Sequence, residues 1–148
     1  MMGSTASRGF SRRGLLVWCA LLGSAIAIPA RVWAALKRPT TAFGATALDQ
    51  AFEELGSIPA VHEGIRFTTP DIAENGAVVP IKIEVDAQTL PNVTKVYVLV
   101  EKNPNPMVAA FYIPDDTDVY VVTRVKVAQT SSLFAVVEAE GKLFMQSK

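Results

Sequence analysis

The stretch AVVPIKIEVD, residues 77–86, decides the fold of this chain. Its polar side chains Lys82 and Glu84 alternate with apolar ones, a period of two that is typical of a strand with one face on a core and one in water. The apolar positions are Val79, Ile81, Ile83 and Val85. Pro80 has no amide hydrogen for a sheet ladder, so we expect the start of this strand to lie at an edge or a bulge.

The chain then repeats short β-rich runs separated by turn residues. The further runs are residues 65–69, 96–100, 109–113, 119–127, 133–139 and 142–145. About seven short strands at this spacing predict an all-β fold, an antiparallel β-sandwich of the immunoglobulin-like kind. Residues 96–100 are apolar on both faces, which indicates a strand in the interior of two layers or one partly under a partner.

One short helix is expected ahead of the strands. Thr46 is a suitable N-cap with Asp49 three residues later, and Gly56 is a suitable stop. One face of the helix between these two residues is apolar and should dock on the sheet. This face consists of Leu48, Ala51, Phe52 and Leu55. Residues 35–45 are expected to form a flexible lead-in, so the sandwich domain with its short N-terminal helix spans 46–148.

Residues 1–34 have the features of an export signal. Arg12 and Arg13 stand directly before a short apolar run. Small residues then precede a cleavage position between Ala34 and Ala35. The adjacent arginines match twin-arginine export to the periplasm, and a Sec signal with two chance arginines is the alternative. The apolar run of about 14 residues is shorter than the about 20 that a membrane-spanning helix needs, so we expect cleavage rather than stable membrane insertion.

Removal of this signal leaves an acidic protein. The chain contains 14 lysines and arginines and 14 aspartates and glutamates, and four of the arginines lie in the signal. The mature chain therefore has 10 basic and 14 acidic residues. This balance disfavours nucleic acid and anionic lipid as partners, because both need a basic surface. The one cysteine, Cys19, also lies in the signal, so the mature chain is expected to have neither a disulfide nor a thiolate.

The sequence contains no recognisable catalytic constellation. The single histidine, His62, has no second metal ligand at a suitable spacing and no serine or cysteine nucleophile nearby. The adjacent carboxylates Asp115 and Asp116 have the pattern of ordinary surface charge. Their loop, residues 114–118, lacks the glycine and the distal glutamate of a calcium loop. We therefore expect a protein that is not an enzyme and that has no metal and no cofactor.

Three stretches of the chain resemble one known family. They are TPDIAENGAVVP (69–80), VEKNPNP (100–106), and TRVKV (123–127) followed by AEGK (139–142). Together they resemble SoxY, the carrier subunit of the periplasmic thiosulfate-oxidising Sox system, over about residues 48–148. The resemblance implies an immunoglobulin-like sandwich, twin-arginine export, and a heterodimer with a SoxZ-like subunit. It also implies other Sox enzymes as further partners.

The resemblance breaks off at the C-terminal end. In the family the last strand continues into a glycine-rich arm, GGCGG, whose cysteine carries the sulfur intermediates. This sequence reaches Gln146, Ser147 and Lys148 with no such cysteine, so the covalent role cannot be assigned to any residue. A paralogue kept for partner binding, a truncated gene and an arm supplied elsewhere are the alternatives.

We expect a non-enzymatic homologue of the sulfur carrier that acts by protein association. The competing class is an exported sandwich unrelated to sulfur that binds a small molecule or a protein. In that case Tyr97, Phe111 and Tyr120 would line its pocket.

Overall fold

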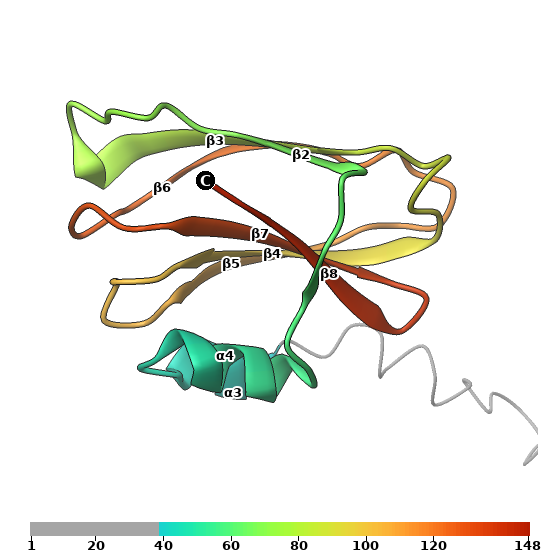
Figure 1. Ribbon diagram of the computed structural model, residues 1–148, viewed down its shortest axis with the longest axis horizontal. Coiled ribbons are helices and arrows are strands. Elements are labelled where there is room, and N and C mark those ends of the chain that lie inside the picture. Colours follow the sequence, from blue (N-terminus) through green and yellow to red (C-terminus); the bar gives the residue numbers. More distant parts are fainter. Residues whose placement is uncertain (1–38) are drawn as a thin grey trace, which may run out of the picture. The chain divides into compact units, whose positions relative to one another are not determined.

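Residues 39–148, which the computed structural model of the protein describes, form two sheets that face each other and two short helices (Figure 1). The larger sheet has the strand order β1-β8-β7-β4-β5 and the smaller one β2-β3-β6. All neighbouring strands are antiparallel except β1 and β8. This arrangement confirms the predicted all-β sandwich. The elements are α3 (Thr40–Gly44), α4 (Leu48–Leu55), β1 (Ala60–Val61), β2 (Ile65–Thr68), a 3-10 helix η1 (Gly76–Val78), β3 (Val79–Val85), β4 (Val93–Val100), β5 (Met107–Tyr112), β6 (Tyr120–Val125), β7 (Leu133–Ala139) and β8 (Lys142–Ser147).

Strand β3 shows the alternation that its sequence predicts. Val79, Ile81 and Ile83 are buried in the core between the sheets. β3 is the central strand of its sheet, yet Pro80 lies beyond the last residue of β3 that pairs with β2 and faces only β6 as a neighbouring strand. At this point the hydroxyl of Thr69 donates to the carbonyl of Pro80 (3.2 Å). Pro80 therefore lies at an edge, as expected, but only because β2 ends before it; the later part of β3 is flanked by strands on both sides.

Strand β4 is apolar on both faces because both faces are covered by the protein itself. Val96, Val98 and Val100 belong to the core between the two sheets. Tyr97 and Leu99 point to the other side of the large sheet, into a second core cluster that includes residues of both helices. The two helices thus cover the second face of β4, which the sequence alone could have assigned to a partner protein.

Helix α4 docks on the sheet as predicted, through Phe52, whose ring meets that of Phe134 edge-to-face at 6.0 Å. Gly56 ends the helix with a φ of 113°. The N-terminal prediction was wrong by one residue, because Ala47 is the N-cap and makes no side-chain cap bond. The amide of Thr46 instead donates to the side chain of Gln50 (3.2 Å).

The flexible lead-in expected over residues 35–45 is wrong for its C-terminal part. Residues 40–44 form helix α3, with Ala42 fully buried, and Ala45 directly after it is fully buried too. The small side chains allow close packing, and the side-chain amide of Asn105 donates to the carbonyl of Ala45 (3.2 Å). The ordering contact comes from a distant loop, so local sequence did not indicate it. Residues 35–38 lie outside the described part of the chain.

The connection into β3 ends in the 3-10 helix η1. Asn75 caps η1, its side-chain oxygen accepting from the amide of Ala77 (2.9 Å) at an extended φ of −135°. Gly76 is required by a close approach, because a Cβ atom there would lie 2.5 Å from the carbonyl oxygen of Val127. The carbonyl of Gly76 accepts from the amide of Val127 (2.7 Å), which holds the segment before β3 against the chain just after β6.

Candidate functional site

The residues proposed for export lie outside the described residues. These are Arg12, Arg13, Ala34 and Ala35, together with Cys19. Within residues 39–148, no helix is long and apolar enough to cross a membrane.

The three aromatic residues proposed to share a pocket lie in three different places, so that hypothesis is wrong. Tyr97 is buried in the cluster under the helices. Phe111 packs against the core between the sheets, and Tyr120 is 63% exposed on β6. Successive residues of a strand point to opposite faces of its sheet, and the sequence specified neither the strand order nor which face each aromatic residue would share with the others.

Tyr97 belongs to a half-buried polar cluster on the helix side of the large sheet. Its hydroxyl donates to Glu138 Oε2 (3.0 Å), and the same carboxylate binds the ammonium of Lys95 at 3.0 and 3.1 Å. The hydroxyl of Thr94 adds a bond of 3.3 Å to Glu138 Oε1. Burial raises the pKa of Tyr97 strongly, and the charge of Glu138 adds to this rise. Tyr97 therefore stays a proton donor that fixes Glu138, which is a structural role.

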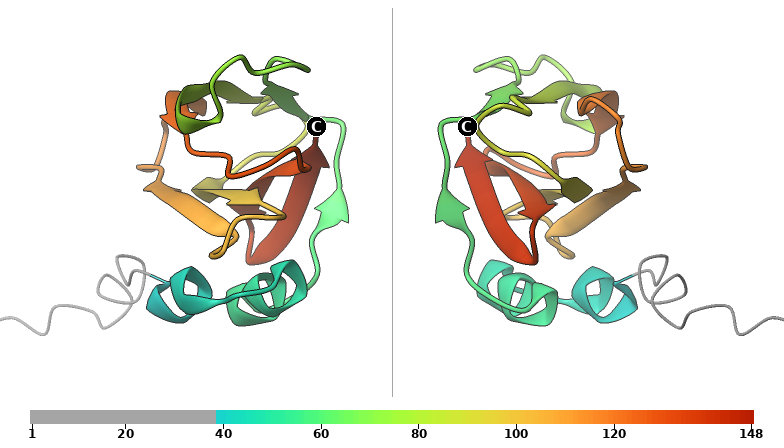
Figure 2. Two further views of the ribbon diagram at one scale, coloured as in Figure 1. Left: turned by 90° about the vertical axis from the view of Figure 1, so that its left-hand side faces the viewer. Right: turned by 90° about the vertical axis from the view of Figure 1, so that its right-hand side faces the viewer.

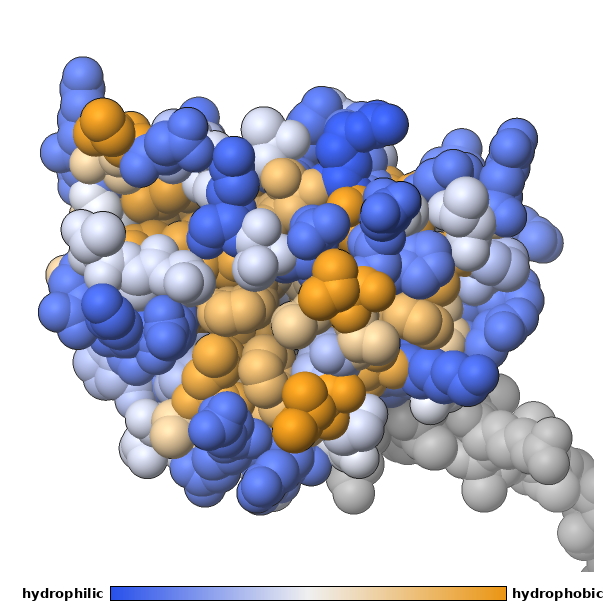
Figure 3. Space-filling model, in the orientation of Figure 1, coloured by the Kyte–Doolittle hydropathy of each residue, from blue (hydrophilic) through white to orange (hydrophobic). Residues whose placement is uncertain are grey.

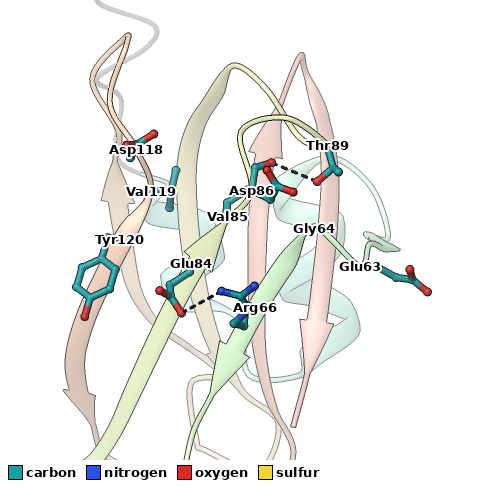
Figure 4. A pocket seen from close by; sticks show the side chains of 10 residues that line it. All are labelled: Glu63, Gly64, Arg66, Glu84, Val85, Asp86, Thr89, Asp118, Val119 and Tyr120. Carbon is teal, nitrogen blue, oxygen red and sulfur yellow. Dashed lines mark hydrogen bonds and ion pairs between the residues drawn. The ribbon is translucent and has the colours of Figure 1, made fainter.

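A hollow of about 600 Å³ lies across one end of the small sheet, and the charged residues that line it are mostly acidic (Figure 4). Carboxylates surround it, and Arg66 lies 3.8 Å from Glu84. The residues that line it are Glu63, Gly64, Arg66, Glu84, Val85, Asp86, Thr89, Asp118, Val119 and Tyr120. A general base would need a nucleophile or an acid partner within hydrogen-bond reach, and this lining supplies no thiol, imidazole or lysine amine.

Glu84 is held ionised at the side of this hollow. A hydrogen bond from the Lys82 ammonium (2.9 Å) lowers the pKa of Glu84, and the charge of Arg66 lowers it further. An ionised carboxylate between two cations is neutralised rather than poised for proton transfer. Among residues 39–148, no three histidine, cysteine or carboxylate side chains come together as a possible metal-binding group.

His62 has a structural place, at the start of the connection from β1 to β2. Its Nδ1 accepts a hydrogen bond from the amide of Gly64 (3.0 Å), and its ring meets Phe144 edge-to-face at 5.1 Å. The backbone amide of His62 continues the β1–β8 ladder by donating to the carbonyl of Met145 (3.1 Å). The imidazole thus stabilises the connection from β1 to β2 and holds it against β8.

The last strand runs in register to the end of the sequence given. Lys148 exchanges two backbone hydrogen bonds with Leu133, at 2.9 and 3.0 Å. Its ammonium lies 3.4 Å from Asp71. Asp71 and Leu133 also line a hollow of about 480 Å³ between the segment before β3 and the loop before β7. Lys148 is therefore anchored on both sides next to an open hollow.

Exposed apolar side chains gather on the face where β8 and β1 lie, above the helices (Figure 3). Ile58 is 77% exposed and Val61 is 68% exposed. Val61 belongs to β1, an edge strand of the large sheet that pairs only with β8 among the described residues. We call Ile58 and Val61 the β1 surface. This surface was not predicted from the sequence, where its one signal is a pair of β-branched residues three positions apart in a segment assigned to no element.

Comparison with known proteins connects this geometry to a family. The family model described as "Sulfur oxidation protein SoxY" matches residues 50–148. The chain belongs to the SoxY family. This membership confirms the resemblance seen in the sequence and decides against a sandwich unrelated to sulfur oxidation.

A solved structure agrees with the family match. The sulfur carrier protein SoxY from Chlorobium limicola f thiosulfatophilum is 35% identical to this chain, with a TM-score of 0.61. The match covers 72% of this chain and 92% of that protein. A comparison with curated protein sequences gives no match. The fold described above is thus the SoxY fold, and the match to the Chlorobium protein spans nearly the whole of that chain.

Proposed function

We propose that this protein is an exported sulfur carrier of the SoxY type that acts by protein association rather than by catalysis. The observation that carries the proposal is the family match over residues 50–148, supported by the likeness to a protein named as a sulfur carrier. Three of the polar groups described above support a non-enzymatic role, because Glu84, Tyr97 and His62 are each held by an ion pair or a structural hydrogen bond.

Its partner is a SoxZ-like subunit, which binds over the β1 surface. Ile58 and Val61 expose large apolar side chains beside an edge strand, a combination that favours a protein neighbour. Co-expression with a SoxZ-like protein should give a stable heterodimer. Ile58→Asp with Val61→Asp should prevent its recovery on a sizing column, whereas Ile72→Asp, in an equally exposed loop position, should not. A monomer that ignores the partner would contradict the proposal.

Residues 35–148 do not themselves bind sulfur covalently. A sulfur adduct needs a thiolate, and these residues contain no cysteine. Any thiol that carries sulfur therefore lies outside residues 35–148, on a further segment or on another protein. Incubation of residues 35–148 with thiosulfate and the oxidising Sox enzymes should leave their mass unchanged. The same domain with GGCGG appended after Lys148 should gain sulfur, and an adduct on the unmodified domain that is lost on reduction would overturn the proposal.

Export to the periplasm uses the twin-arginine route, with a mature start at Ala35. The adjacent Arg12 and Arg13 and the small residues before Ala35 support this. Replacement of both arginines by lysine should stop export, while the mass of the exported wild-type protein should correspond to residues 35–148. Recovery of uncleaved protein in the membrane would contradict this assignment.

A further inference from the structure

Strand β6 has an open edge. It is the outer strand of the small sheet and, among residues 39–148, pairs only with β3 (Figure 1). The carbonyl of Val119 accepts from Val85 (3.2 Å), and the amide of Val127 donates to Gly76 (2.7 Å), so the odd-numbered residues of this run bond toward the segment around β3. Because bonding direction alternates along a strand, the backbone groups of Tyr120, Val122 and Arg124 point to the open side.

One end of this open edge is closed by a side chain. The side-chain amide of Asn103 donates to the carbonyl of Lys126 (2.8 Å), and its oxygen accepts from the amide of Ala128 (2.8 Å). Asn103 thus bonds to two residues of the chain after β6 as a neighbouring strand would. The ladder left open before it runs over residues 120–124 and has three residues whose backbone groups point outward, with Val122 at its centre. We call Tyr120, Val122 and Arg124 the β6 edge.

Two of the three side chains of the β6 edge do not protect it against pairing. Proteins usually guard an open edge with charged side chains, proline or a bulge, and of these the β6 edge has only the charge of Arg124. Here Tyr120 and Val122 are large, apolar and 63% and 61% exposed. By contrast, no residue of β5, the outer strand of the other sheet on this side, is exposed to that extent. A single exposed apolar residue needs no explanation, but two at alternate positions on an open ladder favour a second strand.

The charges beside the β6 edge indicate which strand that is. Asp118 precedes the edge by two residues and Lys126 follows it by two, so the row reads Asp118, Tyr120, Val122, Arg124, Lys126. Among the described residues, none of the three charged ones has an ion-pair partner. A row with an acid at one end and bases at the other is complementary to itself when reversed.

We propose that two copies of this chain pair antiparallel through their β6 edges, about a two-fold axis at Val122. Each Asp118 then lies opposite Lys126 of the second copy, each Tyr120 opposite Arg124, and Val122 opposite Val122. The open backbone groups form about six hydrogen bonds, since each facing pair is of the doubly bonded kind. The two small sheets join into one sheet with the order β2-β3-β6-β6-β3-β2. This inference goes beyond the proposed function, because the SoxZ-like partner was assigned to the β1 surface on the other sheet.

The dimer should be weak and reversible. Three residues per copy bury much less than the about 800 Å² per partner that a stable interface needs. Tyr120 opposite Arg124 adds a cation–π contact, and the ion pairs at the ends are exposed. We therefore expect the sedimentation coefficient of the exported protein to rise with its concentration.

A charge exchange tests the pairing. Asp118→Lys places two lysines opposite each other at both ends, and Lys126→Asp places two aspartates there, so each should weaken dimerisation about tenfold. The double variant restores opposite charges and should return to within about threefold of the wild type. Asp115→Lys and Lys142→Asp make the same charge changes at exposed positions outside the row of residues 118–126 and should have no effect. Thermal unfolding of each variant checks that the fold is intact.

Hydrogen exchange gives an independent measurement on the wild-type protein. The amides of Tyr120 and Val122 should become protected as the concentration rises, whereas those of Val121 and Thr123, already bonded to β3, should not change. A protein that stays monomeric at all concentrations would overturn the proposal. So would a dimer whose charge variants weaken without rescue by the double variant, or protection that appears only when a SoxZ-like subunit is added.

Discussion

Replacement of Phe52 by alanine should test whether the two helices belong to the stable fold. Phe52 is 5% exposed and packs edge-to-face on Phe134 of β7 at 6.0 Å. Removal of a buried phenylalanine side chain costs about 3–5 kcal/mol of unfolding free energy. We expect the low end, about 3 kcal/mol, because α4 has only eight residues and can settle into the space. For a domain of this size that loss lowers the melting temperature by about 15 °C.

Urea unfolding of Phe52→Ala, Phe134→Leu and the double variant measures this effect and its origin. The two rings should be coupled by about 1 kcal/mol, the usual contribution of an aromatic pair beyond its buried area. Glu54→Ala, on the exposed side of the same helix, is the matched control and should change stability little. A loss below about 1 kcal/mol for Phe52→Ala would refute the reasoning, because the helices would then not be needed to cover β4.

Three further substitutions test single contacts by urea unfolding. Tyr97→Phe should cost about 1.5–3 kcal/mol, because it removes a buried donor to the charged Glu138; no loss would contradict this. Gly76→Ala should cost about 1–3 kcal/mol, because its Cβ would meet a backbone carbonyl that cannot move freely; unchanged stability would show that this segment gives way. The hydrogen bond from Lys82 lowers the pKa of Glu84, so its contribution is present above the ordinary pKa of 4.5 and is lost as the pH falls through the folded value. Glu84→Gln should therefore be less stable than the wild type at pH 7 and equal to it near pH 3, and a difference that persists at low pH would disprove the ionic origin.

The strands could be predicted because their information is local. Alternating burial in β3 follows directly from the sequence, and the continuous apolar run of β4 indicated two covered faces. Family membership was likewise readable from short stretches. What covers the second face of β4 was not readable, because the answer depends on α3 and α4, which join the sheet through Phe134 and Asn105 more than 50 residues away.

The interaction surfaces were hidden for a similar reason. Tyr97, Phe111 and Tyr120 look alike in sequence, but strand order puts one under the helices, one against the core and one in solvent. β1 has only two residues and exists because β8 lies beside it. An open edge cannot be recognised from the strand itself, since it depends on the absence of a neighbour in the fold.

The two proposed surfaces lie on opposite sides of the sandwich, and this has a consequence for the assembly. β1 is the outer strand of the large sheet on the side where β2 lies against β8, whereas β6 is the outer strand of the small sheet on the other side (Figure 2). Neither pairing uses a residue of the other, so binding of a SoxZ-like subunit leaves the β6 edge free. We therefore expect a heterodimer at low concentration and two heterodimers joined through β6 at high concentration. Asp118→Lys should weaken only the second step, and weakening of both steps together would show that the two surfaces are one.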